Sequence, residues 1–69
     1  MKPVSGRTFA RCLERHGWSL LRVNGSHHVY GKSGMVARIT VPIHGNADLK
    51  IGLQRALMKS AGLSEGDLV

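Results

Sequence analysis

Residues 18–32 read WSLLRVNGSHHVYGK, and this stretch predicts a β-hairpin. In its first half, apolar side chains alternate with Arg22, the period of two that is typical of a strand with one buried face. The dipeptide Asn24-Gly25 follows, and such a pair favours a two-residue turn between antiparallel strands. We therefore expect a strand before Asn24, a turn at Asn24-Gly25 and a second strand over residues 26–32.

A third alternating segment follows the hairpin. After a turn at Ser33-Gly34, residues 35–41 read MVARITV, and Pro42 should end the strand because it has no N–H to donate. The alternation predicts one apolar face that includes Leu21, Val23, Ile39 and Val41. The opposite, uncovered face would then present Arg22, Arg38 and Thr40.

Helical patterns stand on both sides of the three strands. The first, over residues 5–17, lies between an N-cap serine, Ser5, and a terminating glycine, Gly17. The second ends at Gly62. Helical spacing places Phe9, Cys12, Leu13 and His16 on one side of the first helix and Leu53, Leu57 and Ala61 on one side of the second. We predict a single α+β domain over residues 1–69, ordered α-β-β-β-α, with a three-stranded antiparallel sheet and both helices on one face.

The charge of the chain indicates a polyanionic partner. Ten Lys and Arg residues against four Asp and Glu residues give a formal net charge of +6, which favours nucleic acid or an acidic protein. The single cysteine, Cys12, cannot form an internal disulfide, and no apolar run approaches the roughly 20 residues that span a bilayer. We therefore expect a cytoplasmic protein that is neither secreted nor inserted in a membrane.

Two adjacent histidines, His27 and His28, begin the second strand, where neighbouring side chains point to opposite faces. Since Tyr30 would bury more apolar area than Gly31, we place Tyr30 and His28 on the covered face and His27 on the basic face. An exposed imidazole there suits RNA cleavage, in which the 2′-hydroxyl attacks the neighbouring phosphorus. Supporting phosphate contacts are expected from the side chains of Arg22, Lys32 and Arg38, from Ser26 and from the backbone of Gly25.

Several residues also have purely structural interpretations. Cys12 and Trp18 are expected in the core, Met35 and Met58 as fillers of gaps in the core, and His16 as a cation at a helix end. A zinc site formed by His27, His28 and His44 is conceivable, but adjacent ligands on a strand diverge and no thiolates accompany them. We therefore predict neither a metal ion nor another cofactor.

The sequence resembles the HicA (YcfA-like) toxins of bacterial toxin–antitoxin pairs over nearly all of its length. The resemblance is carried, in order, by HGW at His16–Trp18, GSHH at Gly25–His28, the aromatic Tyr30, ITVPIHG at Ile39–Gly45, and an LK.G…AGLS run from Leu49 to Ser64. Two positions depart from the family's pattern. Leu53 stands where a helix-capping threonine is common, and GKSG lacks the usual His-Pro after the aromatic residue.

This resemblance implies a double-stranded-RNA-binding-domain-like fold and an mRNA interferase silenced by a HicB-type antitoxin. It assigns the catalytic role to His27, the histidine that follows Gly25-Ser26. The leading hypothesis is thus a metal-independent endoribonuclease toxin. Two alternatives are a non-catalytic RNA-binding module of the same fold and an accessory protein that binds only another protein through its basic face.

Overall fold

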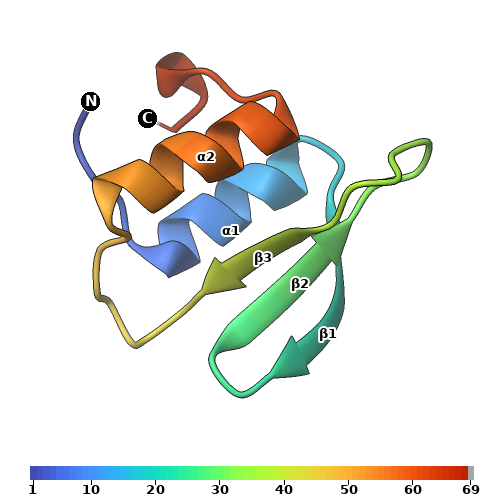
Figure 1. Ribbon diagram of the computed structural model, residues 1–69, viewed down its shortest axis with the longest axis horizontal. Coiled ribbons are helices and arrows are strands. Elements are labelled where there is room, and N and C mark those ends of the chain that lie inside the picture. Colours follow the sequence, from blue (N-terminus) through green and yellow to red (C-terminus); the bar gives the residue numbers. More distant parts are fainter. Residues whose placement is uncertain (69) are drawn as a thin grey trace.

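The computed structural model describes residues 1–68 of the chain. The helices are α1 (Gly6–Arg15) and α2 (Ile51–Ala61), the strands are β1 (Ser19–Asn24), β2 (His27–Gly31) and β3 (Ile39–Pro42), and a 3-10 turn, η1 (Glu65–Leu68), closes the chain. The strands form one antiparallel sheet in the order β1-β2-β3. Both helices lie nearest β3, and β1 is the strand farthest from them (Figure 1). The predicted α-β-β-β-α order is confirmed.

The start and the end of α1 follow the predicted signals. Ser5 is the N-cap, and its hydroxyl accepts a hydrogen bond of 3.1 Å from the Thr8 N–H. The helix ends at His16, and Gly17 takes a left-handed φ of 91° that a residue with a side chain would adopt only with strain. The inward side chains of α1 form one core with Ile39 and Val41 of β3 and with Trp18. The predicted burial of Cys12 and Trp18 is thus confirmed.

The hairpin turn lies one residue later than the sequence predicts. Asn24 pairs with His27, so the two-residue loop is Gly25-Ser26 and β2 begins at His27. Gly25 has a φ of 63°, whereas Ser26 does not have a positive φ. This is the arrangement of a type II′ turn, which requires glycine at the first loop position and accepts serine at the second. Asn24 is therefore the last residue of β1 and not part of the turn.

A bulge in β1 overturns the predicted facing of Leu21. Leu20 pairs with Tyr30 and Arg22 pairs with Val29, which leaves Leu21 as an extra residue. A Cβ placed on Gly31 would come within 2.7 Å of Leu21 Cδ1, so the Leu21 side chain lies over Gly31 on the uncovered face of the sheet. The extra residue breaks the period of two, and Leu21 does not enter the core.

The position of β1 at the edge of the sheet explains a second difference. Val23 pairs with His28, opposite the core residue Val41, and so keeps the predicted facing. It is nevertheless 52% exposed, because the helices cover β3 and do not extend over β1 (Figure 1). Every residue of β1 is exposed.

The third strand is shorter than predicted. It runs only from Ile39 to Pro42, and residues 32–38 form a loop. The Arg38 guanidinium donates hydrogen bonds of 3.3 and 3.2 Å to the carbonyls of Met35 and Val36, which hold the loop closed on itself. Met35 is 40% exposed, so its predicted role as a gap-filler is wrong, whereas Met58 is buried as expected.

The buried side of α2 is rotated from the predicted one. Gln54 and Met58 are its buried residues, Leu57 and Ala61 are partly buried, and Leu53 is exposed. The Gln54 side chain accepts a hydrogen bond from the Val4 N–H at 2.8 Å and donates one to the Lys2 carbonyl at 3.0 Å. A fully buried amide thus ties the N-terminal segment to α2, which compensates for placing a polar group in the core.

The C-terminal turn packs against α1. The Asp67 carboxylate accepts hydrogen bonds from the N–H and the hydroxyl of Ser64 at 2.7 and 3.1 Å. The Cys12 thiol donates to the Asp67 carbonyl at 3.1 Å, and His16 Nε2 lies 3.4 Å from Asp67 Oδ1.

Among residues 1–68, no helix is both long and apolar enough to cross a bilayer.

Candidate active site

The two adjacent histidines of β2 lie on opposite faces of the sheet, as predicted. His27 pairs with Asn24 and Pro42 and is exposed. His28 pairs with Val41 of the core and is half-buried. Tyr30, which shares the face of His28, is only 3% exposed. The imidazole that solvent and a large substrate can approach on the uncovered face is therefore that of His27.

The hairpin turn holds His27 at a defined place. The Ser26 carbonyl accepts a hydrogen bond of 2.8 Å from the Ile43 N–H, so the pairing of β2 with the chain after β3 continues past His27. A Cβ on Gly25 would meet no atom within 4 Å, so the backbone of the turn stands open. The start of β2 is thus anchored on one side and accessible on the other.

Arg22 is the cationic side chain of the sheet nearest to His27 by register. Arg22 pairs with Val29. Two pairs further along the same ladder, Asn24 pairs with His27. Diagonal neighbours of this kind lie roughly 7–8 Å apart, within the reach of an arginine side chain. Val29 is 6% exposed although it faces away from the helices, because Arg22 and Thr40 flank it on the neighbouring strands.

Arg38 and Lys32, also expected at the site, lie elsewhere. The Arg38 Cδ is 3.5 Å from a Cβ placed on Gly31, four residues along β2 from His27, which corresponds to roughly 13 Å. The Lys32 ammonium lies 5.9 Å from the centre of the Trp18 ring. The expected phosphate-binding residues therefore divide into a group beside His27, namely Arg22, Gly25 and Ser26, and a group at the opposite end of the sheet.

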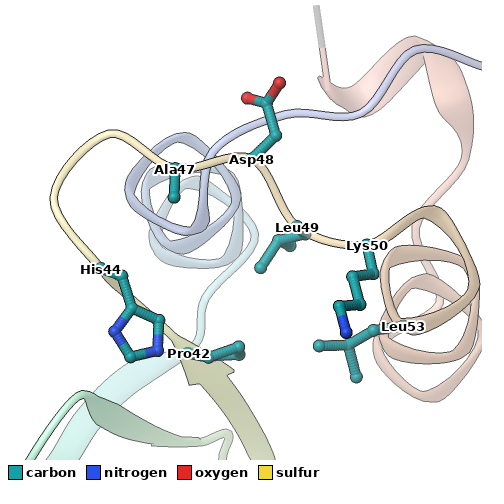
Figure 2. A pocket seen from close by; sticks show the side chains of 7 residues that line it. All are labelled: Pro42, His44, Ala47, Asp48, Leu49, Lys50 and Leu53. Atoms are coloured by element: carbon teal, nitrogen blue, oxygen red, sulfur yellow. The ribbon is translucent and has the colours of Figure 1, made fainter.

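A cleft that the sequence did not predict lies beyond Pro42. Its volume is about 220 Å³, and it is lined by Pro42, His44, Ala47, Asp48, Leu49, Lys50 and Leu53 (Figure 2). Pro42 lines the cleft and also pairs with His27, so this proline is adjacent to both. No periodicity marks these residues, because they come from the end of β3, the loop that follows it and the first turn of α2. The sequence pattern groups Leu53 with the inward side of its helix, and only the structure shows that Leu53 is exposed at this cleft.

The sheet carries no carboxylate. No Asp or Glu stands between Glu14 and Asp48, a segment that contains all three strands. The groups with shifted pKa values lie elsewhere: burial raises the pKa of the Cys12 thiol and of the Tyr30 phenol, and hydrogen bonds from Ser64 lower the pKa of Asp67. The uncovered face is thus a basic surface suited to a polyanion.

The histidines considered as zinc ligands do not form a metal site. His27 and His28 point to opposite faces of β2, so they cannot bind the same ion together with His44. Within the described residues, no three His, Cys, Asp or Glu side chains gather in a way that could hold a metal ion. The chemistry available at His27 is that of an imidazole, an arginine and open backbone donors.

Comparison with known proteins identifies the family. The sequence profile of the family described as HicA toxin of bacterial toxin–antitoxin matches residues 6–63, from the first residue of α1 past the end of α2. No curated protein matches the chain. Because this match covers most of the 69 residues, the chain belongs to the HicA toxin family: it is the toxin of a toxin–antitoxin pair, and its family implies a HicB-type antitoxin as its partner.

Proposed function

We propose that this toxin is an endoribonuclease that cleaves mRNA, with His27 as its catalytic residue. The observation that carries the proposal is the position of His27, whose imidazole is exposed on the uncovered basic face beside the open hairpin turn. His28 lies on the other face, where it is half-buried and pairs with the core residue Val41.

In the proposed reaction, the RNA supplies the nucleophile. The His27 imidazole takes the proton of a ribose 2′-hydroxyl, the 2′ oxygen forms a bond to the adjacent phosphorus, and the bond from phosphorus to the 5′ oxygen breaks. The proton held by the imidazole is then available to the departing 5′ oxygen. The products are a 2′,3′-cyclic phosphate and a free 5′-hydroxyl, and no metal ion takes part.

Arg22 and the turn would stabilise the charge that develops on the phosphoryl oxygens. The Arg22 guanidinium is a diagonal neighbour of His27, and the Gly25 backbone and Ser26 lie directly before it. Lys32 and Arg38, at the other end of the sheet, would contact phosphates farther along an extended RNA chain. A HicB-type antitoxin would silence the enzyme in the cytoplasm, where its mRNA substrate is found.

Analysis of the products of a labelled single-stranded RNA tests the proposal. The toxin should cut it in excess EDTA and leave 2′,3′-cyclic phosphate or 3′-phosphate ends, and the same RNA with a 2′-deoxynucleotide at the scissile position should stay intact. Inactivation by EDTA, or products with a 5′-phosphate, would contradict the mechanism. RNA that is bound but never cut would favour the non-catalytic RNA-binding module instead.

A further inference from the structure

The cleft beside Pro42 has the composition of a small-ligand site. Its inner walls come from Pro42, Leu49 and Leu53, and Leu53 is 39% exposed although it is apolar. At its rim stand the His44 imidazole and the Lys50 ammonium, while the Asp48 carboxylate points away from the other lining side chains (Figure 2). Apolar walls with a few polar groups at the edge are typical of sites that bind a small organic molecule.

Lys50 leaves a positive charge at this rim. It is the N-cap of α2, yet its side chain makes no capping hydrogen bond, and the first turn of α2 contains no acidic residue. The ion pairs found among residues 1–68 involve Glu65 and Asp67 and do not include Lys50. The cleft therefore combines an apolar interior with a free cation, which suits a ligand that is apolar on one side and anionic on the other.

The place of the cleft relates it to the proposed catalytic residue. Pro42 and His27 are directly opposite each other in the ladder between β2 and β3. Residues paired in this way have Cβ atoms roughly 4.5–5.5 Å apart and share a face of the sheet. A phosphate located at His27 would thus lie beside Pro42, which also lines the cleft, so a neighbouring nucleotide of the same RNA would be next to the cleft.

We propose that the cleft is a nucleotide subsite. It binds the base of the nucleotide that adjoins the scissile phosphate, and this base lies between Pro42, Leu49 and Leu53. The phosphate of the same nucleotide lies at Lys50. The volume of about 220 Å³ is smaller than the roughly 300–1,000 Å³ of sites that enclose drug-sized ligands, and it suits a single base. The inference rests on the proposed function, because it places the scissile phosphate at His27. It makes Leu53 and Lys50 determinants of where the RNA is bound.

Filling the cleft while preserving α2 tests the proposal. The probe is a short single-stranded RNA that is 2′-O-methylated throughout, so that binding is measured without cleavage, by fluorescence anisotropy. Leu53→Trp should weaken its binding at least about fivefold, the lower end of the effect of removing the surface on which one base packs. Ser60→Trp, which places the same side chain at an exposed position of α2 seven residues beyond Leu53 and outside the cleft, should bind like wild type. Equal affinities of Leu53→Trp and wild type would overturn the proposal.

Removal of single bases makes the test specific. An abasic nucleotide placed at successive positions of the probe should weaken wild-type binding most at one position, and this weakening should disappear in Leu53→Trp, since the subsite is already blocked. A weakening of the same size in both proteins would overturn the assignment. So would a Leu53→Trp variant that keeps its RNA affinity but loses affinity for the antitoxin, because the cleft would then be part of the protein interface.

Amide NMR of the wild-type protein gives a measurement that depends on no variant. Titration with the methylated RNA should shift the amide signals of Leu49, Lys50 and Leu53, and unmoved signals would contradict the subsite. If these signals shift but unmodified RNA is never cut, the proposed function fails and the cleft remains a site that binds RNA. If RNA is cut at His27 while these signals stay in place, the subsite fails and the proposed function stands.

Discussion

His27 and His28 are adjacent in the chain, yet β2 directs their side chains to opposite faces of the sheet. His27 faces solvent between Asn24 and Pro42, whereas His28 is half-buried between Val23 and Val41. A pair of identical residues therefore has two environments, and the effects of replacing each one can be separated. The same geometry explains why one strand can carry a reactive group on one face and support the core with the other.

Alanine substitution of the two histidines should separate catalysis from stability. His27→Ala should abolish RNA cleavage and growth arrest and leave the melting temperature nearly unchanged, because the side chain is exposed. His28→Ala should instead lower the free energy of unfolding by about 1–3 kcal/mol and keep its activity at low temperature. Cleavage assays and thermal unfolding of both variants provide the check. A stable but inactive His28→Ala beside an active His27→Ala would move the catalytic role to His28.

The arginines of the sheet should contribute unequally to RNA binding. Arg22→Ala should weaken binding and reduce the slope of log affinity against log salt by about 0.7 for each phosphate that Arg22 neutralises in the wild type, because Arg22 is a diagonal neighbour of His27. Arg38→Ala should have a smaller effect, since that guanidinium is held by backbone carbonyls. Arg11→Ala, an exposed position of α1, is the charge-matched control. The salt dependence of RNA affinity measures all three, and equal effects at Arg22 and Arg11 would contradict a binding site on the sheet.

Two glycines at the starts of the helices should respond to alanine in opposite ways. A Cβ on Gly6 would collide with the backbone carbonyl of Pro42, so Gly6→Ala must push α1 away from the end of β3. We expect it to destabilise the protein by about 1–3 kcal/mol or more. A Cβ on Gly52 would meet no atom within 4 Å, and Gly52→Ala should stabilise α2 by roughly 0.5–1 kcal/mol. Urea unfolding of the two variants compares them directly, and similar stabilities would show that α1 does not depend on this close approach.

Asp67 should make the stability of the fold depend on pH in the acid range. Hydrogen bonds from the Ser64 N–H and hydroxyl, and then the nearby His16, hold the pKa of the Asp67 carboxyl below its usual range. The unfolded chain therefore takes up this proton at a higher pH than the folded one. The stabilisation is fully present above about pH 4, the usual range of an aspartate, and is lost as the pH falls through the lower folded value.

Replacing Asp67 should remove this contribution. Asp67→Asn should unfold more readily than wild type at pH 6, and the difference between the two should shrink as the pH falls below about 4. Ser64→Ala, which removes one of the two hydrogen bonds from Ser64, should behave as an intermediate case. Urea unfolding from pH 6 to pH 3 measures the effect. A difference that stays constant over this range would show that the Asp67 charge does not stabilise the fold.

Much of the fold could be predicted because its signals are local. Ser5 and Gly17 mark the ends of α1 through their own backbone preferences, and Gly62 ends α2 with a left-handed φ of 71°. The facing of His27 follows from Tyr30 three residues later, since a strand alternates strictly and the larger apolar side chain takes the covered face. Each of these features depends on residues that are close together in the chain.

Only the tertiary structure determined which side chains the other elements bury. The apolar spacing of α2 fits more than one side of the helix, and Gln54 became the buried residue because Lys2 and Val4 supply partners for its amide from the far end of the chain. The bulge that turns Leu21 outward depends on how β1 pairs with β2. The exposure of β1 depends on where the helices end.

The cleft beside Pro42 is the clearest case of a feature that exists only in the folded chain. Pro42 and Leu53 are eleven positions apart in the sequence, with a loop between them, and neither predicts a binding site by itself. The sequence alone determined the order of the elements, both ends of α1, the C-terminal end of α2 and the face of β2 that carries His27. The relation of that histidine to Leu53 and Lys50 arose from the packing of α2 against β3, because a helix and a strand have no preferred mutual position until their side chains are buried together.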